Sequence, residues 1–282
     1  MHSIEITKET CTIVQDGVKV ASVPLVDLVA AIQAQAEQTP PLDLIPDGVR
    51  FLRRRGDAVA VVTEVMPVAR TVQWLADNSP VPFGPKAVYR TVRLSFPYVV
   101  LVIVFQRGAL TGYQQCFYRN APLSSLSDPL FLPNLYNVAE RSGQACWLCL
   151  AKLTPSVARL GWGRKLAEIH DHLWGGSWNR SSEVHEGNSF WSRPAVDRRV
   201  SSIEAWEKHS AADPRFAVTL PWKPANTTVE KVMSQMLDAV APLRTPKTAD
   251  AVAALLLNAA PAGAGGAAGT APTLAGILGL LK

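Results

Sequence analysis

The strongest β-strand pattern lies in the middle of the chain. Apolar side chains occupy every position of Val99–Phe105, which is typical of a central strand covered on both faces. Shorter apolar segments on either side are separated by turn residues, such as those of Arg54–Asp57, and Gly108–Gly112 suits the last turn. The pattern predicts an antiparallel meander with strands at Val49–Arg53, Ala58–Val65, Thr71–Leu75, Tyr89–Leu94, Tyr98–Gln106 and Gln114–Tyr118.

The N-terminal segment has a different pattern. Ser3–Thr7 and Cys11–Val23 alternate between apolar and polar residues, and Asp16 with Gly17 suits a tight hairpin turn. A helix is expected from Pro24 to about Glu37, because apolar residues recur there on one face. We therefore expect residues 1–45 to form an extension of hairpin and helix.

The C-terminal half combines short elements with a biased tail. The predicted elements are a helix at Arg164–Leu173, a Trp-rich loop at Trp174–Trp191, a helix at Ser202–Lys208, a strand at Phe216–Leu220 and a helix at Thr227–Val240 capped by Asn226 or Thr227. The Trp-rich loop could be a partner-binding surface or part of the core. Beyond Pro242 the chain is rich in Ala and Gly. This composition predicts a flexible tail at 243–282 after a domain at 46–242.

The order of these elements defines the expected fold class. A helix precedes an antiparallel meander, and an irregular segment and further helices follow it. This order predicts an α+β fold in which the helices pack against a β-meander.

Composition narrows the classes of function. The 282 residues are 48% hydrophobic and 18% charged, enough for one or two domains. The net charge of +5 is carried by scattered arginines and gives little support to nucleic-acid binding. Four unevenly spaced cysteines do not resemble a disulfide framework, so we expect a cytoplasmic protein. The N-terminus lacks signal-peptide features, and no apolar run is long enough to span a bilayer.

The segment Phe131–Leu150 holds the residues best suited to covalent chemistry. Pro133 and Asn134 favour a rigid, irregular loop, from which the Asn134 carboxamide could point outward. Gly143 allows a second turn, and the apolar residues around Cys146 would anchor its thiol at the edge of a core. A thiol beside a fixed amide donor suits acyl transfer through a thioester.

Two other interpretations of the cysteines are weaker. Cys146 and Cys149, followed by His170 and His172, have the residue types of a zinc site, but histidines two apart on a helix point in different directions. A thioredoxin-like role requires the two cysteines to open a helix after a strand, whereas here an irregular loop precedes them. Cys149 is then a core neighbour, and Cys11 is expected to be a packed thiol.

The Phe131–Leu150 segment resembles the active site of ubiquitin-conjugating enzymes. In those enzymes a His-Pro-Asn element precedes a Gly-x-Ile-Cys-Leu element; here Leu132, Pro133 and Asn134 precede the step from Gly143 to Cys146. Leu in place of His is similar to the prokaryotic D-type conjugating-like family of plasmid and phage gene clusters, which includes protein B of the PRTRC clusters. The resemblance covers about residues 48 to 180.

This resemblance implies a fold and an activity. It implies a ubiquitin-conjugating-like fold and a transferase that carries a ubiquitin-like modifier as a thioester on Cys146, with Asn134 stabilising the oxyanion. The implied partners are a ThiF-type adenylating activating enzyme, the modifier and an acceptor protein, and no cofactor is required. Asp128, Glu140 and His170 are all open as the general base. The alternatives are a non-catalytic conjugating-like binding module of a mobile-element cluster and an unrelated interaction protein.

Overall fold

The chain is described here by a computed structural model that covers residues 2–15, 17–28, 48–141, 143–150, 153, 157, 160–185 and 196–242. It divides into two units, one of residues 1–38 with 242–282 and one of residues 39–241. Residues 29–47, which include most of the predicted N-terminal helix, and the predicted tail at 243–282 lie outside the described residues.

The described part of the first unit is a small antiparallel sheet. Its strands are β1 (His2–Ile6), β2 (Thr10–Gln15) and β3 (Val18–Pro24), in the order β1-β2-β3. Gly17, with a φ of 80°, lies in the turn between β2 and β3, as predicted. Cys11 is buried at 5% exposure, which confirms the packed thiol.

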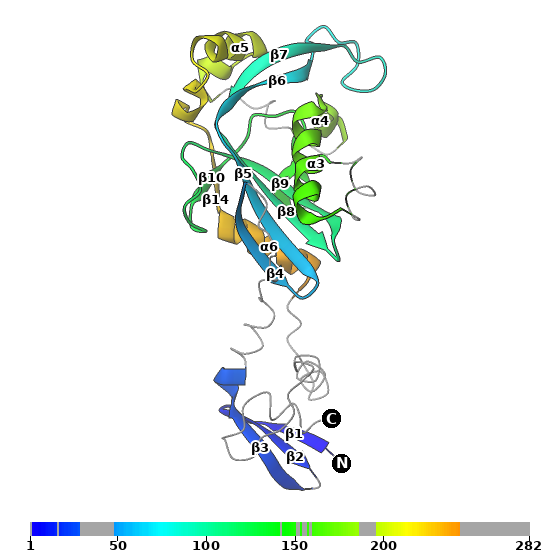
Figure 1. Ribbon diagram of the computed structural model, residues 1–282, viewed down its shortest axis with the longest axis vertical. Coiled ribbons are helices and arrows are strands. Elements are labelled where there is room, and N and C mark those ends of the chain that lie inside the picture. Colours follow the sequence, from blue (N-terminus) through cyan, green and yellow to red (C-terminus); the bar gives the residue numbers. More distant parts are fainter. Residues whose placement is uncertain are drawn as a thin grey trace. The chain divides into compact units, whose positions relative to one another are not determined.

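The second unit has an α+β fold with mostly antiparallel sheets (Figure 1). Its larger sheet has the order β11-β12-β9-β8-β5-β4, with β10 joining β9 and β14 joining β10, and its smaller sheet has the order β13-β6-β7. The strands are β4 (Val49–Arg55), β5 (Ala58–Val65), β6 (Val68–Leu75), β7 (Tyr89–Phe96), β8 (Tyr98–Gln106), β9 (Ala109–Arg119), β10 (Pro129–Phe131), β11 (Val138–Arg141), β12 (Gln144–Leu148), β13 (Ser177–Trp178) and β14 (Pro224–Thr228).

Helices and short 3-10 helices complete this unit. They are α3 (Trp162–Gly175), α4 (Ser181–His185), α5 (Ile203–Ala212), α6 (Val229–Val240), η2 (Arg198–Val200) and η3 (Phe216–Thr219). None of the helices described here has the length and apolar character needed to cross a membrane.

One long β-ribbon belongs to both sheets. Val65 faces Val99 in the larger sheet and Val68 faces Phe96 in the smaller one, so the register continues through the bend. Pro67 and Pro97 therefore face each other at the bend, where neither can donate a backbone hydrogen bond. The ladder is interrupted at that point, and Figure 1 shows the ribbon turning from β5 into β6.

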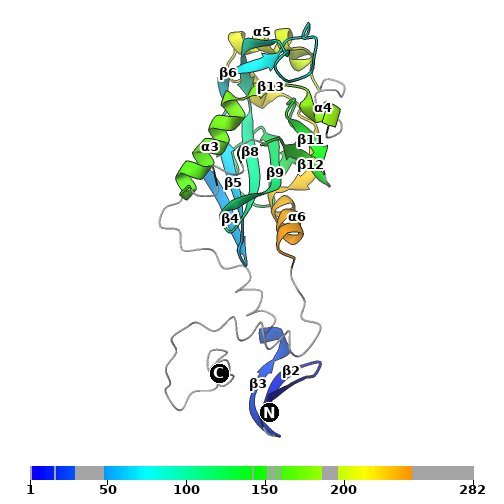
Figure 2. The same ribbon diagram turned by 90° about the vertical axis from the view of Figure 1, so that its right-hand side faces the viewer.

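The central strand β8 is covered on both faces. Two residues of α3 contact the Phe105 ring. The Trp162 ring centroid lies 5.1 Å from that of Phe105, and Lys165 Nζ lies 5.4 Å from the Phe105 centroid. Helix α6 lies on the opposite face (Figure 2), where Ser234 accepts a hydrogen bond from Arg53. This double cover explains why every residue of Val99–Phe105 is buried.

An aromatic cluster fills the space under the smaller sheet. Trp74 of β6 lies 5.6 Å from Trp178 and 6.4 Å from Trp206, measured between ring centroids, and all three side chains are at most 1% exposed. Phe96 lies 5.1 Å from Trp174. Trp174 and Trp178 of the predicted Trp-rich loop therefore pack in the core, whereas Phe190 and Trp191 lie outside the described residues.

Three local predictions were wrong. Residues Phe216–Thr219 form a 3-10 helix instead of a strand, and in the turn before it the Asp213 carboxylate accepts a hydrogen bond from the backbone N–H of Arg215 at 2.8 Å. The last meander turn is Arg107-Gly108, and Gly112 lies within β9 at a register shift. The cap of α6 is Thr228, whose hydroxyl accepts from the backbone N–H of Lys231.

Candidate functional site

The candidate site lies between two strands, β12 and β10, that pair with different parts of the same edge of β9. Gln115 of β9 pairs with Trp147 of β12, whereas Tyr118 pairs with Phe131 of β10. The hairpin of β11 and β12 thus diverges from β10 and its neighbour β14. The bulge at Gly112 holds the hairpin, since its carbonyl accepts a hydrogen bond from Trp147 Nε1 at 2.9 Å.

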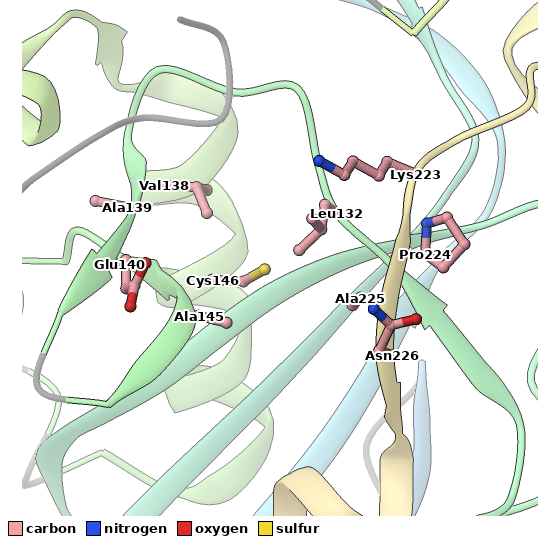
Figure 3. Close-up of a pocket in the computed structure, with 10 residues that line it drawn as sticks. All are labelled: Leu132, Val138, Ala139, Glu140, Ala145, Cys146, Lys223, Pro224, Ala225 and Asn226. Atoms are coloured by element: carbon pink, nitrogen blue, oxygen red, sulfur yellow. The ribbon is translucent and has the colours of Figure 1, made fainter. Parts of the chain in front are cut away.

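A cavity of about 330 Å³ occupies this fork. The Cys146 sulfur points into it between the hairpin and β14 (Figure 3). Several lining residues are exposed, whereas the Cys146 residue is only 1% exposed. The thiol therefore forms the floor of a depression that opens at its rim. The lining residues are Leu132, Val138, Ala139, Glu140, Ala145, Cys146, Lys223, Pro224, Ala225 and Asn226.

The loop at 132–137 is irregular and well anchored, as predicted. The backbone N–H of Leu132 donates to the carbonyl of Lys223 at 2.8 Å, and Ser182 donates to the carbonyl of Tyr136. The Tyr136 ring lies 4.7 Å from that of Trp74. The aromatic cluster therefore packs against the loop whose Leu132 lines the cavity.

Asn134 lies in this loop but is not among the cavity-lining residues. It is 5% exposed, which differs from the outward-pointing carboxamide that we expected. The flanking Leu135 and Tyr136 are buried as well, so the loop turns its centre toward the core. The structure thus places Cys146 in the cavity without Asn134, and the oxyanion role of Asn134 stays a prediction.

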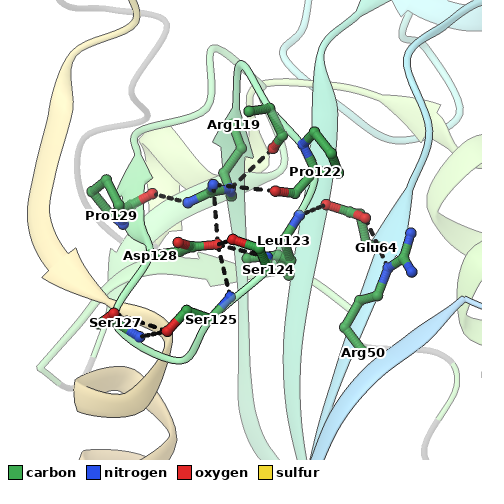
Figure 4. Close-up of polar contacts among 11 residues, drawn as sticks. Arg50, Glu64, Arg119, Pro122, Leu123, Ser124, Ser125, Ser127, Asp128 and Pro129 are labelled. Atoms are coloured by element: carbon green, nitrogen blue, oxygen red, sulfur yellow. Dashed lines mark hydrogen bonds and ion pairs between the residues drawn. The ribbon is translucent and has the colours of Figure 1, made fainter.

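The three candidate bases occupy different environments. Glu140 is exposed and lines the cavity, whereas Asp128 and His170 are not among its lining residues. Asp128 accepts hydrogen bonds from the backbone N–H groups of Ser124 and Ser125 at 2.8 and 3.1 Å (Figure 4). Burial acts to raise the pKa of Asp128, but these hydrogen bonds and the charge of Arg119 lower it overall. Asp128 thus orders its loop.

His170 lies on α3 and contacts the larger sheet. Its Nε2 is 3.1 Å from the Thr63 hydroxyl. Burial and the charge of Arg70 lower the pKa of His170 below its usual value, despite the opposing effect of Asp171. The folded protein therefore favours the neutral form of His170.

This neutral histidine should make stability depend on pH. Below about pH 6.5 the unfolded chain binds a proton at His170 that the folded chain binds only at lower pH. The free energy of unfolding should therefore rise between pH 5 and 7, by up to about 1.4 kcal/mol per pH unit from this group. Urea unfolding at both pH values should show a smaller rise for His170→Gln. An equal rise in the two proteins would contradict this assignment.

The other cysteines lie outside the cavity lining. Cys116 is fully buried in β9, and burial raises the pKa of its thiol, whereas Cys149 is partly exposed. Within the described ranges, no group of three or more His, Cys, Asp or Glu side chains could hold a metal ion.

Sequence reasoning missed the wall that β14 supplies. Lys223, Pro224, Ala225 and Asn226 are far from Cys146 in the sequence and carry no recognisable motif. Only the pairing of β10 with β14 brings them to the thiol.

Comparisons with protein-family models, curated proteins and solved structures found no match for this chain. The function is therefore inferred from the residues and geometry of the cavity.

Proposed function

We propose that the protein is a ubiquitin-conjugating-like transferase that carries a ubiquitin-like modifier as a thioester on Cys146. The observation that supports this proposal is the position of the thiol at the floor of a cavity with exposed residues at its rim. A modifier's extended C-terminus could reach the sulfur there without unfolding of the hairpin. The modifier would come from a ThiF-type adenylating enzyme and pass to an acceptor.

The cavity contains groups suited to each step of acyl transfer. The Cys146 thiolate would attack the thioester carbonyl carbon, and the resulting oxyanion would collapse with release of the activating enzyme's thiolate. Lys223 and Glu140 are the ionisable residues of the cavity lining besides Cys146 itself. In this proposal the Lys223 ammonium would favour the attacking thiolate, and Glu140 would accept the thiol proton. Asp128 and His170, in the environments described above, are less suited to that role.

The proposed fold is a ubiquitin-conjugating-like one with an enlarged hairpin. Strands β4, β5, β8 and β9 are neighbours in one antiparallel sheet, and the segment with Cys146 follows the last of them in the chain. Strands β6 and β7 would then be an extension of the ribbon beyond the facing prolines.

A non-catalytic conjugating-like binding module is the second candidate. It is favoured by the 1% exposure of Cys146 and by the burial of Asn134 away from the cavity lining. In that case the cavity would hold a partner's segment without a covalent step.

Acylation of the native protein distinguishes the two candidates. The probe is the 2-mercaptoethanesulfonate thioester of benzoyl-Gly-Gly, and peptide mass spectrometry at acidic pH locates the acyl group. We expect acylation at Cys146, with Cys11 and Cys116 modified only after unfolding, because both are buried outside the cavity. A native Cys146 that stays unmodified, while the unfolded chain reacts, would contradict the transferase and favour the binding module.

A further inference from the structure

The wall of the cavity that faces the hairpin contains a residue in an uncommon backbone conformation. Asn226 of β14 has a φ of 54°, and Arg107 is the other non-glycine residue with a positive φ in the described part of the chain. Asn tolerates this left-handed region better than most residues, but glycine adopts it more easily. The conformation alone would therefore favour glycine at this position.

A bulge in β14 produces this conformation. Pro129 pairs with Thr228 but Phe131 pairs with Pro224, so three residues of β14 lie opposite the single Leu130 of β10. Bulges of this kind re-aim side chains and are frequent next to active sites. Here the bulge places the exposed Asn226 in the cavity lining together with Cys146 (Figure 3).

We propose that the Asn226 carboxamide is the oxyanion donor for acyl transfer to Cys146. This inference rests on the proposed transferase function. When the Cys146 sulfur bonds to the thioester carbonyl carbon, the π electrons of the carbonyl move to its oxygen. An amide N–H of Asn226 donates to that oxyanion until the bond to the leaving thiolate breaks and the carbonyl re-forms.

The alternative donor, Asn134, fits the cavity less well. It is 5% exposed and does not contribute to the lining, whereas Asn226 is exposed at the rim. The neighbouring Leu135 and Tyr136 are 1% and 6% exposed, so that part of the loop belongs to the core. The donor expected upstream of the thiol in the sequence would thus be supplied by a downstream strand.

The test compares two reactions of the same thiol. Acylation by the benzoyl-Gly-Gly thioester forms an oxyanion, whereas alkylation by iodoacetamide does not. Asn226→Gly removes the carboxamide and suits the positive φ, so the bulge should be retained. We expect acylation of Cys146 to slow roughly 100-fold in Asn226→Gly and in Asn226→Asp, while alkylation changes less than about threefold.

Arg107→Gly is the matched control, because it relieves the same type of backbone conformation in a turn outside the cavity lining. It should acylate like the wild type. Unchanged acylation of both Asn226 variants, or a loss seen in Asn134→Ser instead, would overturn the inference and leave the transferase standing. Wild-type Cys146 that is alkylated but acylates no faster than a cysteine in the unfolded chain would overturn both.

Discussion

Replacing Cys146 with serine should abolish the reductant-sensitive adduct that the protein forms with a ubiquitin-like modifier activated by a ThiF-type enzyme. Serine is almost isosteric with cysteine, so the cavity should keep its shape. Its hydroxyl is far less acidic and cannot form a thioester. We expect adduct formation to fall below about one-thousandth of the wild-type rate, measured by non-reducing gels and intact-protein mass spectrometry.

Cys149→Ser is the matched control for this substitution. Cys149 lies one residue beyond the end of β12 and is not part of the cavity lining, so this variant should keep the adduct. Adduct formation that persists in Cys146→Ser but disappears in Cys149→Ser would assign the thioester to Cys149, outside the cavity lining, and contradict the proposal. An adduct that persists in both serine variants would contradict a thioester on this segment.

Strand positions could be predicted well because their signals are local. The continuous apolar sequence of β8 predicted burial on both faces of the strand. Helices α3 and α6 cover the two faces, which confirms that prediction. The bend at Pro67 and Pro97 could not be predicted, because the effect depends on the register that sets one proline opposite the other. A single proline would have suggested only the end of a strand.

Local signals failed where tertiary contacts decide the conformation. Phe216–Leu220 has the apolar composition of a strand, but it lies between Pro214 and Pro221 and its first residues turn into the core. Gly112 suggested a turn, whereas its carbonyl in a bulge holds Trp147 of the next hairpin. The conformation that such residues adopt depends on the elements that pair with them or pack against them.

The candidate site could be predicted only in part, for the same reason. Cys146 and the irregular loop before it are close in sequence, and both were found from composition and turn residues. Asn226 enters the site through the pairing of β14 with β10, which no local pattern specifies. Asn134 was predicted because Pro133 and Asn134 favour a rigid loop and resemble part of a His-Pro-Asn element, but its side chain is 5% exposed and its loop turns inward.

Replacing Trp74 with alanine should cause the largest loss of stability, about 4 kcal/mol in the free energy of unfolding. The side chain is 0% exposed and contacts Tyr136, Trp178 and Trp206, so its removal leaves a large cavity between the smaller sheet and the 132–137 loop. Urea unfolding monitored by circular dichroism measures the change.

Trp174→Ala is the matched control for the loss of an indole ring. Trp174 stacks on Trp178 at 5.8 Å but is partly exposed, so its loss should cost clearly less, about 1–2 kcal/mol. Because Tyr136 packs on Trp74, the Trp74 variant should also alter the rate at which iodoacetamide alkylates Cys146 under folding conditions. Equal losses of stability in the two variants would show that the cluster does not depend on Trp74, and an unchanged alkylation rate would separate the cluster from the cavity wall.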